Sequence, residues 1–158
     1  MVSKADQYQN PISVNIDIDC DVVTFDTEKL KSTLAGTCPD FGVSSVEINL
    51  AIVDSGAIAG IHLKFLGSDK NTDVISFDTS EQDSEKKVFD IVVNAEMAQL
   101  QAKNRNITAE SELALYCLHG LLHNLGFDDI AQDDAKKMHS TEDEILHRCG
   151  YGIVYKAD

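Results

Sequence analysis

The sequence predicts an α/β fold, a single domain over residues 1–158 in which helices pack on a sheet of about four strands. Segments with strand-like alternation of apolar and polar residues are interleaved with segments that carry helix start and stop signals. In addition, a chain of 158 residues with 43% apolar and 25% charged residues has an ordinary size and composition for one globular domain with one core. We therefore expect no second domain.

The first predicted strand covers residues 12–19, where apolar and polar residues alternate with a period of two. Thr27 is then expected to be the N-cap of an amphipathic helix over residues 28–34. The segment 36–42 contains two glycines and a proline, so we expect it to end this helix.

A second strand is predicted over residues 46–53. These residues alternate at first and then become wholly apolar, which indicates that one end of the strand is well buried. Asp54 or Ser55 can cap a short helix over residues 56–65.

The middle of the chain predicts two more strands with a polar connection between them. Residues 67–71 are expected to form a loop and residues 73–78 a short strand. The highly charged residues 79–87 should form a surface loop, with disorder as the alternative. A strand over residues 89–94 and a helix over residues 95–103 should follow.

The next helix is the feature around which the chain is organised. Thr108 is the expected N-cap, and Glu110 and Glu112 place negative charge in the first turn, where the helix dipole favours it. No Asp, Glu, Lys or Arg occurs in residues 113–125, so this helix should be buried on nearly all sides. Gly126 then supplies a C-terminal stop.

A charged helix over residues 133–147 is the last predicted element, with Ile145 and Leu146 as its clearest apolar contacts. His139 and His147 lie on this charged helix, so we expect both at the surface. The four cysteines are scattered and form no Cys-x-x-Cys pair, which favours small buried apolar residues over disulfides or metal ligands.

Two histidines on the buried helix point to chemistry. His119 and His123 are four residues apart, so their imidazoles lie on one helical face about one turn apart, where they can bind a single metal ion. After Gly126 the chain can turn back and bring Asp129 toward the same point, with Asp128 as the competing ligand in the same turn. The spacing His-x3-His-x5-Asp predicts one Zn²⁺ per chain, although iron, nickel or manganese also suit these ligands.

Other interpretations of these residues remain open at this stage. The two histidines could be buried side chains satisfied by backbone groups, and Asp129 could cap the helix that follows. If Asp129 binds the metal, Asp128 is the candidate to accept a hydrogen bond from a histidine N–H outside the metal's ligand sphere.

A resemblance to a known family rests on three segments. Residues 119–128, with the pattern His-Gly-x-Leu-His-x-x-Gly-aromatic-Asp, resemble the signature of the YbeY family of bacterial metal-dependent endoribonucleases. Residues 61–77 and the strand that begins near Asp90 are similar to two further segments of that family, in the same order. The resemblance covers roughly residues 12–150 and implies a mixed, zincin-like sheet crossed on one face by a buried metal-binding helix.

The resemblance also implies a cleft and two departures from the family pattern. The cleft candidates are Thr72, Asp73, Ser76 and Lys64. Asp129 stands where the family usually has a third histidine ligand, and Leu66 stands where it often has an arginine linked to RNA cleavage. A carboxylate also binds zinc, whereas losing the arginine removes a cation that could stabilise phosphoryl charge; Lys64 or Lys70 could replace it in part.

The preferred function is a metal-dependent endoribonuclease of rRNA maturation and ribosome quality control, in which metal-activated water attacks a phosphodiester. The alternative is a ribosome-associated binding factor with a mainly structural metal and little cleavage. A metallopeptidase-like hydrolase is less favoured, because Gly120 occupies the position of the glutamate base in zincin peptidases.

The charge of the chain bears on its partners. Its net charge of −14 opposes independent tight binding to RNA, so affinity for rRNA or pre-ribosomal particles should depend on ribosome-associated proteins. Met1–Asn10 is polar, and no apolar run approaches the roughly 20 residues of a membrane span. We therefore expect a cytoplasmic protein with no membrane partner.

Overall fold

The computed structural model describes residues 11–152, 154 and 155, so the segment Met1–Asn10 lies outside the described residues. The elements, in chain order, are β1 (Ile12–Ile18), α1 (Thr27–Asp40), β2 (Val46–Val53), α2 (Ser55–Leu66), β3 (Val74–Asp78), β4 (Lys87–Asn94), α3 (Ala95–Arg105), α4 (Ala109–Asn124) and α5 (Gln132–Arg148). The strands form one sheet in the order β1-β2-β4-β3. Strands β1, β2 and β4 are parallel and β3 is antiparallel to β4, which confirms the predicted α/β class with a mixed four-stranded sheet.

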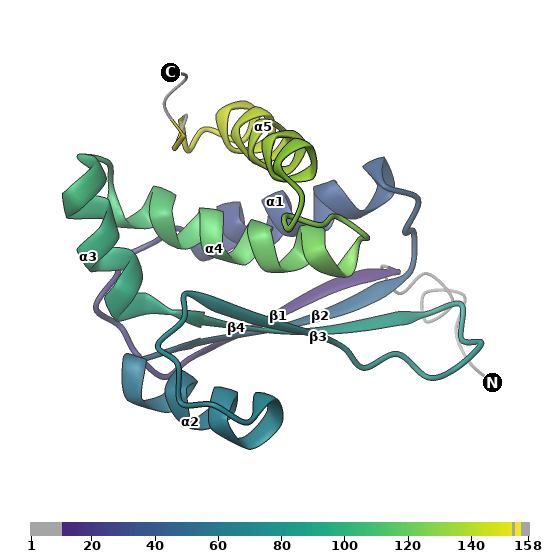
Figure 1. Ribbon diagram of the computed structural model, residues 1–158. Helices are drawn as coiled ribbons and strands as arrows, with labels where there is room; N and C mark the ends of the chain where they lie inside the picture. The colour runs from purple at the N-terminus through teal and green to yellow at the C-terminus, as the bar shows by residue number, and fades with distance from the viewer. Residues whose placement is uncertain (1–10, 153, 156–158) are drawn as a thin grey trace.

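The helices divide between the two faces of the sheet (Figure 1). α4 lies across one face, with α1 beside it and α5 stacked above them, whereas α2 lies on the opposite face. The main buried core is on the α4 side, where apolar residues of β2 and β4 meet those of α1, α4 and α5. α4 is therefore enclosed between the sheet and α5, which explains why its sequence is apolar on nearly all sides.

Gly120 marks the closest approach of α4 to the sheet. A Cβ at this position would lie 2.9 Å from Cγ2 of both Ile91 and Val74. The site has no room for a side chain, so Gly120 is required by helix-to-sheet packing. Gly120 stands at the position where zincin peptidases have their glutamate base. Close packing of α4 on the sheet explains why this position is a glycine.

The prediction that α1 ends after residue 34 was wrong. The helix continues through Gly36 to Asp40 because Leu30, Leu34 and Cys38 recur every four residues and are all buried on the core face. Pro39 lies in the last turn, where no long run of helix follows it. The N-cap is also one residue earlier than predicted.

The cap of α1 is Asp26, whose Oδ1 accepts a hydrogen bond from the Lys29 N–H at 3.0 Å. The predicted cap of α2 is confirmed at Asp54, which accepts from the Ala57 N–H. The charged connection between β3 and β4 is an exposed loop, as predicted, and not the alternative of a disordered segment. Among the described residues, no helix is long and apolar enough to cross a membrane.

Candidate metal centre

The histidine pair is positioned by the capped and buried helix α4. The Thr108 side chain accepts a hydrogen bond from the Ser111 N–H, as expected of an N-cap. The helix is buried from Ser111 through Leu118, whereas the two histidines are partly exposed. The exposed fraction of the side chain is 17% for His119 and 31% for His123. The two imidazoles therefore lie on the part of α4 that reaches solvent.

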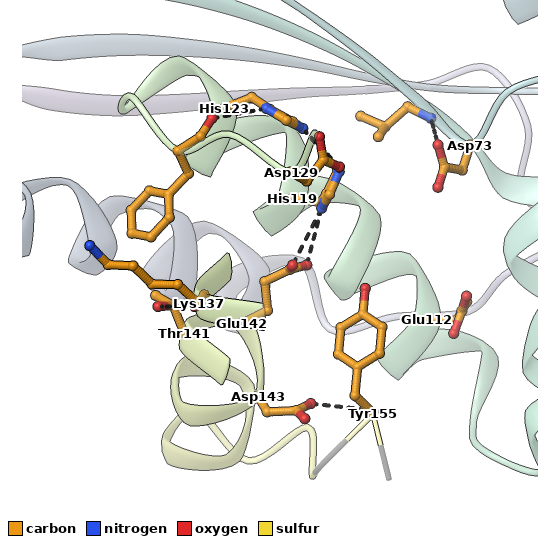
Figure 2. A network of polar contacts seen from close by, with 12 residues as sticks. Asp73, Glu112, His119, His123, Asp129, Lys137, Thr141, Glu142, Asp143 and Tyr155 are labelled. Carbon is orange, nitrogen blue, oxygen red and sulfur yellow. Dashed lines mark hydrogen bonds and ion pairs between the residues drawn. The ribbon is translucent and has the colours of Figure 1, made fainter. Parts of the chain in front are cut away.

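The turn after α4 has the hydrogen bonds of a Schellman motif. Gly126 adopts φ +105°, its N–H donates to the His123 carbonyl, and the Phe127 N–H donates to the Leu122 carbonyl. This left-handed residue reverses the chain so that Asp129 returns to the histidines (Figure 2). The sequence prediction of a glycine stop followed by a returning carboxylate is confirmed.

Three potential ligand atoms converge at this point (Figure 2). The Nε2 atoms of His119 and His123 are 3.1 Å apart. Asp129 Oδ2 lies 3.4 Å from Nε2 of His119 and 3.6 Å from Nε2 of His123. Among the described residues, this is the one group of three or more His, Cys, Asp or Glu side chains close enough to hold a metal ion.

The three separations fit the geometry of zinc. Bonds of about 2.0–2.1 Å in a tetrahedral arrangement place neighbouring ligand atoms about 3.3 Å apart. The observed distances of 3.1, 3.4 and 3.6 Å lie on both sides of this value. Two imidazole nitrogens and one carboxylate oxygen are also a recognised zinc ligand set. The alternative in which Asp129 caps α5 is excluded, because the N-cap residue is Ala131 and no side chain caps that helix.

The remaining ring nitrogens face other groups. Nδ1 of His123 lies 3.1 Å from the Phe127 carbonyl oxygen. Nδ1 of His119 lies 3.4 and 3.3 Å from the two carboxylate oxygens of Glu142 on α5. Asp128 was the residue predicted for this supporting role, but its Oδ1 instead accepts a hydrogen bond from the Ile130 N–H within the turn.

Glu142 was missed because α5 reads as a charged surface helix. A signal was present, since Met138, Glu142 and Ile145 are spaced by four and three residues and share one helical face. All three are buried, and Glu142 is 0% exposed. A carboxylate in the apolar stripe of a helix indicates that it has a buried polar or charged partner, because burying an unpaired charge is costly.

Negative charge surrounds His119. Burial lowers the pKa of His119, but the hydrogen bond and charge of Glu142, together with the charges of Asp73 and Asp129, outweigh it and raise the pKa above its ordinary value. The same carboxylates would attract a cation to the site.

The predicted cleft residues do not all meet at the centre. Asp73 faces it, with Oδ1 accepting from the Val74 N–H at 2.8 Å (Figure 2). Ser76 faces α4, because its Cβ is 3.6 Å from the position that a Cβ on Gly120 would take. Thr72 precedes β3, and its carbonyl oxygen accepts from the Asn94 side chain.

The residues from α2 lie on the other side of the sheet. Lys64 is exposed, and its Nζ is 5.3 Å from the centre of the Phe65 ring. Leu66 is 56% exposed at the end of the same helix. Nδ1 of His62 lies 2.7 Å from the Ser68 carbonyl oxygen, which ties α2 to the loop that follows.

The fold and the converging side chains define a metal-binding α/β domain with a His-x3-His helix across one face of a mixed sheet. Residues 14–150 match the family described as Endoribonuclease YbeY. The chain belongs to this family.

Individual relatives agree with the match. The chain is 38% identical over 112 residues to Endoribonuclease YbeY of Myxococcus xanthus, an alignment that covers 68% of this chain and only 38% of that protein. It is 35% identical over 115 residues to Endoribonuclease YbeY of Staphylococcus saprophyticus, covering 68% of this chain and 74% of that protein. A solution structure of a Thermotoga maritima protein has the same fold, with a TM-score of 0.54, 23% identity, and coverage of 85% of this chain and 90% of that one.

Proposed function

We propose that this protein is a metal-dependent endoribonuclease that cleaves rRNA during maturation and quality control of ribosomes. The observation that carries the proposal is the convergence of His119, His123 and Asp129 at separations suited to one zinc ion, in a chain of the YbeY family. One Zn²⁺ per chain would be bound by these three residues.

Zinc lowers the pKa of a bound water toward neutrality and polarises a phosphoryl oxygen, and so supplies both a nucleophile and charge stabilisation for phosphodiester hydrolysis. The residues of the chain hold and expose the site. Each histidine would supply Nε2 as an electron-pair donor to the metal, and Asp129 would add a carboxylate oxygen from a side chain that is 37% exposed. Because all three side chains reach solvent in part, a phosphate group can approach from the open side.

Metal content and RNA cleavage test this proposal together. Elemental analysis should find about one metal ion per chain in the wild type, and little in His123→Ala. Cleavage of structured rRNA should require the metal, and both a chelator and His119→Ala should abolish it. His147→Ala is a matched control, because His147 is exposed on α5 and should change neither result. Full metal content in His123→Ala purified without chelators would contradict the ligand assignment.

A second candidate is a ribosome-associated binding factor whose metal is mainly structural. Leu66 in place of the family arginine and the net charge of −14 favour it, because both reduce the cations available to phosphate. The same cleavage assay separates the two, since a binding factor would hold its metal and leave rRNA intact. In either case we propose that ribosome-associated proteins in the cytoplasm supply affinity for pre-ribosomal particles.

A further inference from the structure

We propose that Glu142 is a positioning residue that fixes the ring of His119 for metal binding. The proposal rests on the proposed function, because it takes His119 as a metal ligand. Glu142 lies on α5 and His119 on α4, so the interaction joins two helices across the centre (Figure 2).

The two ring nitrogens of His119 face opposite partners. Nε2 points to His123 and Asp129, whereas Nδ1 lies within 3.4 Å of both oxygens of Glu142. A neutral imidazole carries one proton, and the nitrogen that binds a metal must be the one without it. An ionised carboxylate only accepts, so Glu142 selects the tautomer with the proton on Nδ1 and the lone pair on Nε2.

Packing alone does not account for a carboxylate at position 142. Met138, Ile145 and Leu146 occupy the same stripe of α5, and each is at most 3% exposed. An apolar residue at 142 would complete this stripe without the cost of burying a charge, and such replacements are often neutral or stabilising. The carboxylate therefore reflects a requirement other than the stability of the helix interface.

His123 is oriented by a different interaction. Its Nδ1 faces the Phe127 carbonyl, a backbone group supplied by the turn at the end of α4. His123 is thus oriented by the helix that carries it, but His119 depends on a side chain from α5. A substitution at 142 should affect one ligand and leave the other in place.

The first test is the zinc affinity of Glu142→Gln, measured by competition with a chelating dye. Glutamine keeps the shape and loses the charge, and we expect binding about 10–100-fold weaker, as for other residues that support metal ligands. Glu112→Gln is the matched control, because Glu112 is also 0% exposed but its Oε2 lies 3.7 Å from Nη1 of Arg105, and it pairs with that residue in place of a histidine. Its zinc affinity should stay within about threefold of the wild type.

Two further readouts separate positioning from a structural role. Glu142→Met should leave the metal-free protein as stable as the wild type or more so, while weakening zinc binding, because an apolar side chain suits the stripe. In the zinc-loaded protein, the Nδ1–H proton of His119 should give a downfield NMR resonance that Glu142→Gln shifts or loses to exchange with water. A purely structural residue would lower stability and affinity together.

The outcomes distinguish failure of this proposal from failure of the proposed function. Wild-type protein that binds no zinc would overturn the metal site and, with it, the role of Glu142. Wild-type binding combined with unchanged affinity in folded Glu142→Gln would overturn only the positioning role. Equal losses in Glu142→Gln and Glu112→Gln would also overturn it, since they would reflect any change of buried charge.

Discussion

Replacing Gly120 by alanine should destabilise the protein, against the usual effect of this substitution in a helix. A new Cβ would lie 2.9 Å from Cγ2 of both Ile91 and Val74, a distance at which neighbours must move. Both neighbours have β-branched side chains with few allowed rotamers, Ile91 fully buried on the central strand β4 and Val74 partly buried on the edge strand β3, so their methyl groups have little freedom to turn away. Overpacking of this kind costs about 1–3 kcal/mol.

The helix propensity of alanine works in the other direction. In a helix interior alanine is favoured over glycine by about 1 kcal/mol. Gly36 isolates this contribution, because it lies in α1 with no atom within 4 Å of a Cβ at its position. Gly36→Ala should therefore stabilise the protein by up to about 1 kcal/mol, whereas Gly120→Ala should destabilise it by up to about 2 kcal/mol.

Urea unfolding of the metal-free proteins measures both effects without a contribution from metal binding. The difference between the two variants, about 1–3 kcal/mol, is the cost of forcing α4 from the sheet. If Gly120→Ala is stabilised as much as Gly36→Ala, α4 does not lie as close to β3 and β4 as described. The packing explanation for this glycine would then be wrong.

Three further predictions concern RNA and charge. The isolated protein should bind naked rRNA weakly and with strong salt dependence, because its net charge of −14 repels phosphate; submicromolar binding at physiological salt without added ribosomal proteins would contradict this. Leu66→Arg should be tolerated by the fold, since residue 66 is exposed, and should not change the rate of metal-dependent cleavage, because α2 lies on the face of the sheet opposite the metal centre; a rate raised by about tenfold, as expected of a cation that contacts the transition state, would contradict this placement. Burial raises the pKa of Glu112 against the opposing charge of Arg105, so this group favours the folded state at low pH and loses that contribution as pH rises. Relative to the wild type, Glu112→Gln should be stabilised at pH 7 by about 1 kcal/mol, and by less at pH 4, in paired unfolding curves.

The metal centre could be predicted from the sequence where its determinants are local. The four-residue spacing of His119 and His123 places both on one face of a single helix. Gly126 indicates a turn, because glycine readily adopts the positive φ that ends a helix. Asp129 needed only the short reach of that turn. In contrast, Glu142 lies 23 residues after His119 in the sequence. Only the packing of α5 against α4 determines which carboxylate contacts this histidine.

The same distinction explains the error in α1. Gly36 and Pro39 are local signals that a helix stops, whereas the burial of Cys38 against the core is a tertiary contact that extends it. The order of the strands is also non-local, because pairing β2 with β4 and placing β3 at the edge depends on contacts across the whole chain. The mixed sheet was implied by family resemblance and by no single segment.

The charges around His119 indicate how binding of metal and of RNA are balanced in this protein. Three carboxylates raise the pKa of His119, those of Glu142, Asp73 and Asp129. Their negative charge should also attract a cation to the centre. Those same carboxylates repel the phosphates of RNA, and the net charge of the chain adds to the repulsion at longer range. A bound divalent ion offsets part of this local charge. Metal loading should therefore precede productive contact with RNA, and the remaining repulsion is what a cationic partner would have to overcome.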